Sequence, residues 1–403
     1  MRLVHLSDLH LGFRQYQRQT SAGINQREAD VASVFRTVID RVIALAPDVI
    51  VFAGDIFHNV RPPNPAILHA FSQFARLTES LPECLVVMVA GNHDSPRAAE
   101  TGCILRLFTP LGIHVVDAEA QRLDFPERGL SILAVPDTGV PQRVALDPDP
   151  QAERNVLVLH GEVAGVLPPA AAAAERTTVE ITPEEIGAAR WTYVALGHYH
   201  VFRQIERNAY YSGSIDYTSA NPWGELQEER AAKLHGKVFL EYDLDTGKRT
   251  VHSIKPARAL VDLPRIEGRG LSSGDIDALI RQHVEKVSGG IDDKIVRQVV
   301  RDVPRHIARE IDHTLLREYK KRALHFHLDT RRPDIMRPSV GQGAAGRRAS
   351  LMETVRDKLW SRPLPGDIDR QRLVDMGLHY LSEAEQREGN AAVAASLGEE
   401  DDA

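Results

Sequence analysis

Cysteine is scarce in this chain, and its scarcity excludes two classes of small structural site. Only Cys84 and Cys103 occur among the 403 residues, and no C-x-x-C pair is present. A disulfide framework needs several paired cysteines and a zinc knuckle needs closely spaced ones, so neither is expected here. Free thiols persist in a reducing compartment, and we therefore expect a cytoplasmic protein.

Long apolar runs and phosphate-binding loops are also missing. No apolar run reaches the roughly 18 residues that a membrane-spanning helix needs. The absence of G-x-x-x-x-G-K-[S/T] argues against ATP binding through a P-loop. Gly341–Gly346 formally matches G-x-G-x-x-G, but no strand precedes it, so we expect no dinucleotide site. A signal peptide is not expected either, because its removal would take away polar residues that begin at Asp8.

The chain does contain five short polar clusters, each placed directly after an apolar run. The runs are short and rich in β-branched residues, which is typical of buried strands. Open α/β sheets place their sites just beyond the carboxyl ends of strands, so the clusters mark a candidate site. In chain order they are Asp8–His10, Gly54–Asp55, Gly91–Asp94, His160–Gly161 and Gly197–His200.

The residue types in these clusters favour a centre of two divalent metal ions. Such a centre holds its ions about 4 Å apart and stabilises both the attacking and the leaving oxygen of a phosphoryl transfer. A carboxylate can bridge two ions because each oxygen can bind one, and Asp55 is the best candidate. Imidazole combined with carboxylate and amide oxygens suits a borderline metal such as Mn²⁺. Glycine before Asp55, Asn92 and His198 is expected to let the backbone bend sharply, so that the next side chain points into the site.

Together the clusters resemble the motifs of the calcineurin-like metallophosphoesterase superfamily and, more narrowly, of the SbcD-type DNA-repair exonucleases. The resemblance covers residues 1–255 strongly and residues 256–390 more weakly. It implies that His93 is the catalytic histidine, that Asp94 orients it, and that His58 helps to position the substrate phosphates. It also implies that one ion is held by Asp8, His10, Asp55 and His200, and the other by Asp55, Asn92, His160 and His198.

This resemblance and a change of pattern near residue 256 predict five parts. Residues 1–255 are expected to form the nuclease domain, a four-layer α/β/β/α sandwich. Residues 256–332 are predicted to form a small α/β capping domain, with helices over Ser272–Val287, capped by Ser273 or Asp275, and over Ile307–Arg322. A flexible linker over 333–349, a helical pair over 350–390 and an acidic, disordered tail over 391–403 follow.

The predicted helical pair has too few apolar residues to form a core of its own. Its apolar stripe favours docking onto a partner helix, and packing onto the chain's own capping domain is the alternative. By resemblance, the partner is the coiled-coil base of an SbcC-type ATPase. We also expect the chain to form a homodimer.

The net charge of −7 is awkward for an enzyme that binds DNA, because phosphate contacts usually require lysine and arginine. The distribution is uneven, since Arg297–Arg332 holds ten Lys and Arg against five Asp and Glu. That stretch is either a solvated helix face or a contact with DNA or a partner, and the sequence leaves both open. Part of the acidic excess lies in Glu399–Asp402.

These features predict a two-metal, Mn²⁺-type phosphoesterase, and the resemblance implies a DNA nuclease subunit that works in double-strand break repair. By resemblance, it is an exonuclease on duplex ends and an endonuclease on hairpins or single strands. The first alternative is a phosphatase or small-molecule phosphodiesterase, but protein phosphatases carry G-D-x-x-D-R-G and G-N-H-E where this chain has Gly54–Val60 and Gly91–Asp94. The second is a non-catalytic DNA-end tether, which would need the ligands but not His93 and Asp94.

Overall fold

The computed structural model describes residues 1–96, 102–138, 145–166, 179–333, 351–361 and 369–382. They belong to two compact units, Met1–Pro333 and Asp334–Ala403. Apart from Pro333, the predicted linker over 333–349 lies outside the described ranges, and so does the predicted tail over 391–403. No helix within those ranges combines the length and the apolar character needed to cross a bilayer.

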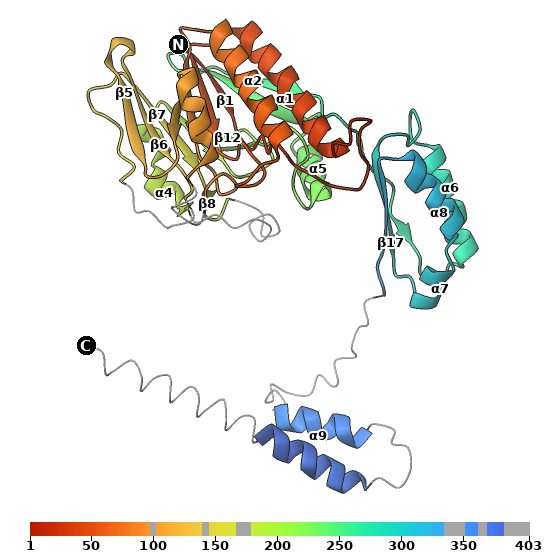
Figure 1. The fold of residues 1–403 in the computed structure, drawn as a ribbon. Coiled ribbons are helices and arrows are strands. Elements are labelled where there is room, and N and C mark those ends of the chain that lie inside the picture. The colour runs from red at the N-terminus through yellow and green to blue at the C-terminus, as the bar shows by residue number, and fades with distance from the viewer. Residues whose placement is uncertain (97–101, 139–144, 167–178, 334–350, 362–368, 383–403) are drawn as a thin grey trace. The chain divides into compact units, whose positions relative to one another are not determined.

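Two six-stranded sheets form the body of the larger unit (Figure 1). The five strands predicted ahead of the polar clusters are all present. Three of them are parallel neighbours in the first sheet, and two are parallel neighbours in the second. The first sheet has the order β14 (Arg249–Ile254), β13 (Lys237–Asp243), β1 (Arg2–Leu6), β2 (Val49–Ala53), β3 (Leu85–Val89) and β4 (His114–Val116). The second has the order β11 (Arg203–Glu206), β12 (Ala209–Tyr211), β10 (Tyr193–Gly197), β7 (Arg154–His160), β6 (Leu130–Val135) and β5 (Gln121–Phe125).

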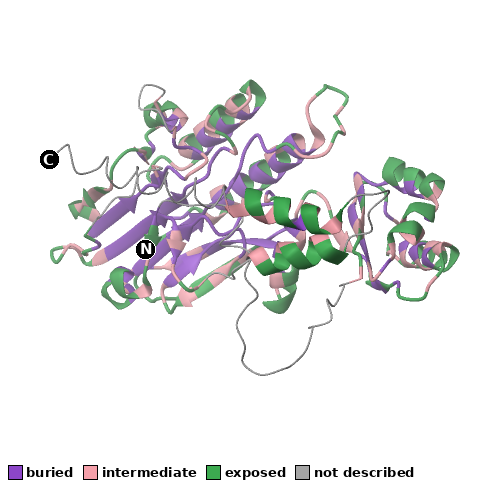
Figure 2. Cartoon of the chain, turned by 90° about the horizontal axis from the view of Figure 1, so that it is seen from below, coloured by how far each residue is buried: buried purple, intermediate pink, exposed green. Residues whose placement is uncertain are grey.

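The two sheets pack face to face between helical layers, so the predicted α/β/β/α sandwich is confirmed. Alternate residues of each strand divide between the layers, as in Val49 and Val51 of β2, which face the second sheet, and Ile50, which faces the helices. The outer face of the first sheet is covered by α1 (Gln26–Leu45) and α2 (Asn64–Ser80). The outer layer on the second sheet is thinner and includes α4 (Pro183–Ile186) and η4 (Ala188–Arg190). Figure 2 shows the result, with buried strands inside and exposed helix faces outside.

Shorter elements complete the sandwich. They are η2 (Ile104–Leu111), η3 (Pro126–Arg128), the two-stranded ribbon of β8 (Glu162–Val163) and β9 (Glu180–Ile181), and α5 (Pro222–Ala231). Of these, α5 faces the candidate site through Glu225.

The predicted capping part is also a mixed α/β structure. Its central strand β17 (Ile295–Arg301) pairs in parallel with β18 (His325–Thr330) on one edge and with β15 (Leu260–Asp262) and β16 (Ile266–Glu267) on the other. The apolar side chains on one face of this sheet pack against its helices in a separate core. The helices are α6 (Ser273–Glu285), α7 (Arg305–Glu310) and α8 (His313–Arg322).

Two predicted details of this part are wrong. Ser272, rather than Ser273 or Asp275, caps α6: its hydroxyl accepts the Asp275 N–H at 3.2 Å while the Asp275 carboxylate accepts the Ser272 N–H at 3.0 Å. The single helix expected over Ile307–Arg322 is two helices. Ile311 is extended, with ψ of 142°, and the Asp312 carboxylate then caps α8 by accepting from the backbone of residues 314 and 315.

The smaller unit contains both predicted helices, α9 (Leu351–Ser361) and a second one over 370–382. Val374 is buried, and Gly377 lies so close to Leu359 that a Cβ would come within 2.5 Å of its Cδ1. The two helices therefore pack on each other. Trp360, Met376 and Tyr380 stay 51%, 49% and 63% exposed, so the pair leaves large apolar side chains at its surface.

Candidate metal centre

The seven predicted metal ligands lie together at the carboxyl ends of β1, β2, β3, β7 and β10. The Nε2 atoms of His10 and His200 are 2.9 Å apart, and Asp8 belongs to the same group of potential ligands. Asp55 lies between this group and the second one, because its Oδ2 is 3.8 Å from His10 Nε2 and 3.3 Å from His160 Nε2. Asp55 thus lies between the two groups, and its bridging of two ions stays a prediction.

The second group centres on the side-chain amide of Asn92. Its Oδ1 lies 3.0 Å from His160 Nε2 and 3.3 Å from His198 Nδ1. On the far side of its ring, His160 Nδ1 is 2.8 Å from the carbonyl oxygen of Ala53. Because a carbonyl can only accept, Nδ1 carries the hydrogen and Nε2 presents its lone pair to the centre, as metal-binding histidines commonly do.

One atom of the centre indicates directly that a cation fits. Asp55 Oδ1 accepts the backbone N–H of His93 at 2.9 Å, but Oδ2 is buried and receives no N–H or O–H from any residue that the structure describes. A buried carboxylate oxygen without a donor is costly unless a cation neutralises it. The full donor set of three oxygen ligands and four imidazoles suits borderline divalent ions. The side chains therefore fit a metal centre, and the assignment of each ligand to one ion stays a prediction.

The backbone at the ligands is held in a rarely populated conformation. Asp8, His10, Asp55 and His198 all have positive φ, with values of 53°, 47°, 52° and 104°. Residues with a Cβ adopt this region at some cost, and such strain concentrates at functional sites. The hydrogen bonds of the two sheets on either side hold these turns in place.

The expected reason for the three glycines is only partly right. Gly54 has φ of 91° and does provide the bend before Asp55. At Gly91 and Gly197 the reason is close packing instead. A Cβ on Gly91 would lie 2.1 Å from Asp55 Oδ1, and one on Gly197 would lie 1.7 Å from the carbonyl oxygen of Ala53. No larger residue fits at these two positions unless the ligands move.

His93 and His58 lie beside the predicted ligands, and the Asp94 carboxylate contacts the backbone of two ligand loops. His93 Nδ1 is 2.8 Å from the carbonyl oxygen of His58, and the two rings stack with their centroids 5.2 Å apart. The Asp94 carboxylate instead accepts three backbone N–H groups, from Gly91, Ile56 and Phe57, at 3.1, 3.1 and 2.9 Å. None of these three contacts is with the His93 ring, and the orienting role of Asp94 stays a prediction. Asp94 joins the second ligand loop to the third, and the His58 carbonyl orients His93.

Burial and mutual charge shift the pKa values of these groups strongly. Burial would raise the pKa of Asp55, but the charges of His160 and His10 more than offset it and hold that pKa well below its usual range. Burial lowers the pKa of His160, whereas Asp55 and Asp8 raise it by more, to about 10. Burial also lowers the pKa of His10 and raises that of Asp94, the latter to about 7.

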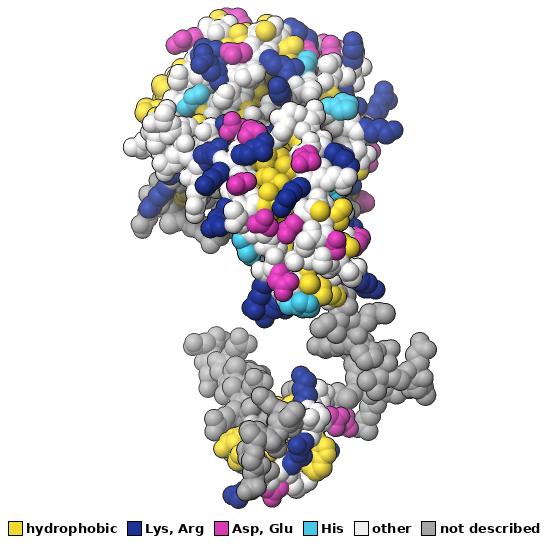
Figure 3. Space-filling view, turned by 90° about the vertical axis from the view of Figure 1, so that its right-hand side faces the viewer, with side chains coloured by type: hydrophobic (Ala, Val, Ile, Leu, Met, Phe, Trp, Pro, Cys, Tyr) yellow, Lys and Arg dark blue, Asp and Glu magenta, His cyan; other side chains and the backbone are white. Residues whose placement is uncertain are grey.

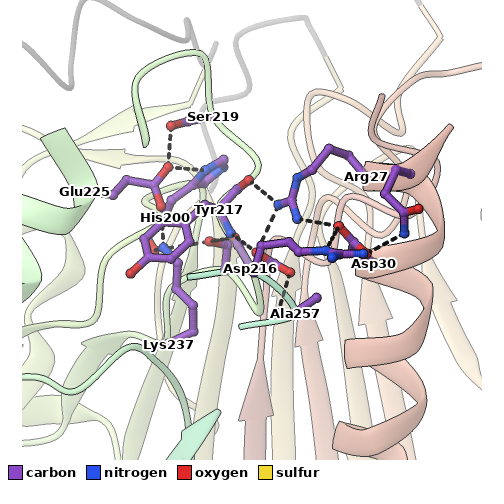
Figure 4. Close-up of polar contacts among 12 residues, drawn as sticks. Arg27, Asp30, His200, Asp216, Tyr217, Ser219, Glu225, Lys237 and Ala257 are labelled. Carbon is purple, nitrogen blue, oxygen red and sulfur yellow. Dashed lines mark hydrogen bonds and ion pairs between the residues drawn. The ribbon is translucent and has the colours of Figure 1, made fainter. Parts of the chain in front are cut away.

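Sequence reasoning missed a buried cluster behind His200 (Figure 4). Glu225 of α5 lies with Oε1 3.6 Å from His200 Nδ1, on the ring side opposite Nε2. Its carboxylate also accepts from the Ser219 hydroxyl and pairs with Lys237, whose Nζ donates to the His200 carbonyl at 3.0 Å. The charge of Lys237 outweighs burial and lowers the pKa of Glu225 to about 2, so this carboxylate stays ionised beside the ligand. No motif marks Glu225 in the sequence.

A second buried cluster centres on Arg27 of α1 (Figure 4). Its guanidinium donates to Asp216 at 3.0 Å and to Asp30 at 3.2 Å, and its side chain is 1% exposed. Asp216 also accepts the backbone N–H of Ala257 at 3.4 Å, and Arg258 pairs with Asp30 at 3.1 Å. The cluster joins α1 of the sandwich to the start of the capping part.

Comparison with known proteins agrees with this geometry. A family model described as Calcineurin-like phosphoesterase matches residues 1–202. Several curated proteins named DNA double-strand break repair protein Mre11 are similar to this chain. The one from Methanocaldococcus jannaschii is 38% identical over 97 residues, which is 24% of each chain. The one from Methanopyrus kandleri is 27% identical over 270 residues, covering 60% of this chain and 54% of the relative. The one from Methanosarcina acetivorans is 24% identical over 395 residues, covering 88% and 61%. The chain thus spans between 24% and 61% of the length of these relatives.

Proposed function

Because the chain belongs to the calcineurin-like phosphoesterase family, we propose that it is a metal-dependent DNA nuclease subunit that acts in double-strand break repair. The observation that carries the proposal is the position of Asp55 between two groups of ligands, with His93 beside them. The names of the similar proteins support DNA as the substrate.

The two ligand groups would hold two divalent ions, which we propose to be Mn²⁺. Asp8, His10, Asp55 and His200 would bind one ion, and Asp55, Asn92, His160 and His198 the other. When bound, such a pair stabilises the charge of the transferring phosphoryl group and lowers the pKa of the attacking water.

His93 is the group that we propose to act on the leaving oxygen. Its Nδ1 carries the hydrogen, because the His58 carbonyl that it contacts can only accept. The proton that His93 gains or gives is therefore the one at Nε2. A protonated imidazole there can donate to the oxygen on which negative charge develops, a contribution worth roughly 10² to 10⁴ in rate. His58, stacked on His93, would position the phosphate groups.

The capping part and the helical pair support a nuclease rather than a phosphatase. A minimal phosphatase has no use for either one. The exposed Trp360, Met376 and Tyr380 support docking of the pair, through residues 350–390, onto the coiled coil of an SbcC-type ATPase. We further propose a cytoplasmic homodimer that trims duplex ends and opens hairpins.

One set of assays tests this proposal. The purified chain, loaded with Mn²⁺, is given linear duplex DNA, hairpin DNA and bis(p-nitrophenyl) phosphate. We expect cleavage of both DNA substrates and much slower cleavage of the small diester. Hydrolysis of the small diester alone would favour a small-molecule phosphodiesterase. DNA binding without any hydrolysis would favour a tether. The His93→Ala variant is the control for contaminating nucleases.

A further inference from the structure

A buried pair of charged side chains, Glu225 of α5 and Lys237 of β13, lies behind the predicted ligand His200 (Figure 4). Lysine and arginine side chains normally lie at the surface, and Figure 3 shows them spread among acidic ones over one face of the larger unit. Lys237, by contrast, is only 2% exposed. A buried ion pair often stabilises a fold no more than apolar side chains of the same size, so stability alone does not account for this pair.

The pair addresses His200 at two points. Lys237 Nζ donates to the backbone carbonyl oxygen of His200 at 3.0 Å. Glu225 Oε1 lies 3.6 Å from Nδ1 of the His200 ring. The other ring nitrogen, Nε2, faces the centre and lies 2.9 Å from His10 Nε2. One ion pair therefore lies against both the backbone and the ring of a single predicted ligand.

His160, in the other group of predicted ligands, has a different partner behind its ring. Its Nδ1 donates to the carbonyl oxygen of Ala53 at 2.8 Å, and that acceptor is neutral. Hydrogen bonds to a charged acceptor are roughly twice as strong as neutral ones. A carboxylate behind a metal-binding histidine also makes the ligand nitrogen on the far side of the ring more basic. Because Glu225 stands behind His200 and a carbonyl stands behind His160, the two groups of ligands are not equivalent.

The start of α5 determines where the Glu225 carboxylate lies. The Asn221 side chain caps the helix by accepting the Gly224 N–H at 3.2 Å, and Pro222 occupies its first turn. Glu225 is the acidic residue of that turn, where the helix dipole favours negative charge. The Ser219 hydroxyl, from the loop before the helix, donates to the same carboxylate. The carboxylate is thus fixed beside the ring by contacts that do not require an ion.

Glu229 offers a comparison within the same helix. It is also buried, follows Glu225 by four residues and so lies on the same face of α5. Its carboxylate pairs with Lys237 Nζ at 3.0 Å and accepts from the Tyr217 hydroxyl at 2.6 Å. The two glutamates share a helix, a buried position and a lysine, and they differ in their remaining neighbours. Glu225 is the one with an oxygen 3.6 Å from Nδ1 of His200.

We propose that Glu225, held in place by Lys237, is a positioning residue that fixes His200 as a ligand through Nε2 and strengthens the binding of one of the two ions. The inference rests on the proposed function. With Nε2 as the ligand atom, the ring hydrogen lies at Nδ1, on the side of Glu225. Lys237 fixes the His200 backbone and the Glu225 carboxylate with the same ammonium group. Only the ion beside His200 should therefore depend on Glu225.

A metal titration without any substrate tests this inference. The full chain is freed of metal with EDTA, dialysed and titrated with Mn²⁺, and the free ion is measured by its electron paramagnetic resonance signal. Glu225→Gln removes the charge and nearly keeps the shape of the side chain. We expect this variant to bind one equivalent of Mn²⁺ roughly 10- to 100-fold more weakly and the other equivalent as tightly as before. Glu225→Asp, which keeps the charge but withdraws it from the ring, should fall between this variant and the wild type.

Glu229→Gln is the matched control. It makes the same change of charge on the same helix and beside the same lysine. Each of the two glutamine variants leaves Lys237 with one carboxylate partner, so urea unfolding in EDTA should show a similar loss of stability in both. Glu229→Gln should nevertheless bind both equivalents of Mn²⁺ like the wild type. This comparison separates a role in positioning His200 from a general role in stability.

Two results would overturn the inference. In the first, Glu225→Gln binds both equivalents of Mn²⁺ as tightly as Glu229→Gln does. In the second, Glu225→Gln weakens both equivalents equally, which would make Glu225 a residue of general stability rather than a partner of His200. Neither result depends on DNA cleavage. A chain that binds Mn²⁺ as expected in all these variants but cuts no DNA would refute the proposed nuclease and leave the positioning role of Glu225 standing.

Discussion

Replacing Arg27 by leucine should destabilise the sandwich far more than an ordinary arginine substitution. The change leaves Asp216, whose side chain is 0% exposed, without its cationic partner. Asp30 is affected less, because Arg258 still pairs with it at 3.1 Å. Removing one partner of a buried ion pair costs about 3–5 kcal/mol. Arg27 makes three hydrogen bonds, to Asp30, Asp216 and the Tyr217 carbonyl, and the two to carboxylates alone, at about 1.5–3 kcal/mol each, give a similar figure. We therefore expect a loss of about 3–5 kcal/mol in the free energy of unfolding.

Urea unfolding in EDTA, followed by tryptophan fluorescence, measures this loss. Arg36→Leu, an exposed arginine on the same helix, is the control and should change stability by less than about 0.5 kcal/mol. The double variant Arg27→Leu/Asp216→Asn should regain much of the lost stability, because no uncompensated charge stays buried while the amide oxygen can still accept from the backbone. A loss below about 1 kcal/mol in the single variant, or a double variant no more stable than it, would refute the reasoning.

Four further outcomes concern the centre and the helical pair. His93→Ala should lower DNA hydrolysis roughly 10²- to 10⁴-fold while metal content is kept, and near-normal turnover would remove its catalytic role. The Asp55→Asn variant should lose at least one of its two equivalents of metal during dialysis, and it should lose more activity than the Asn92→Ala variant. Elemental analysis measures the metal content, and two retained equivalents would contradict the bridging role of Asp55. The Glu225→Gln variant should bind Mn²⁺ roughly 10- to 100-fold more weakly, because the His200 ring loses its charged neighbour. An unchanged Mn²⁺ affinity in a binding titration would show that Glu225 does not contribute to metal binding. Truncation after Arg348 should leave hydrolysis of a small diester intact but abolish co-purification with a coiled-coil ATPase, and a complex of unchanged size would contradict docking.

The strands, and the polar side chains that gather at their ends, could be predicted because their signals are local. A short β-branched run ending in a polar cluster identifies each ligand loop, from β1 and Asp8 to β10 and His198. The contacts of Asp94 and Glu225 could not be predicted, because they join distant segments of the sequence. Asp94 accepts from Ile56 and Phe57, and Glu225 of α5 reaches His200, from which β11 and β12 separate it in the sequence. A sequence motif records which residues are present but not which of two neighbouring polar groups a carboxylate faces.

The break at Ile311 was missed for a different reason. Ile307–Arg322 keeps its apolar residues at helical spacing across the break, so periodicity alone favours one helix. The N-cap preference of Asp312 is the signal that could have revealed two helices.

The predicted ligands come from both sheets: Asp8, His10, Asp55 and Asn92 follow strands of the first, and the second provides His160 at the end of β7 and His198 and His200 after β10. Ions bound there would tie the two sheets together as a removable cross-link, absent from the unfolded chain. Ligand binding to the folded state alone adds about 2.7 kcal/mol at a hundredfold excess over Kd. Metal binding and folding are thermodynamically linked, and the linkage is reciprocal. A substitution that loosens the packing between the sheets would therefore also lower the affinity for the ions. The supply of metal would then decide which mutations the sandwich tolerates, including those far from any ligand.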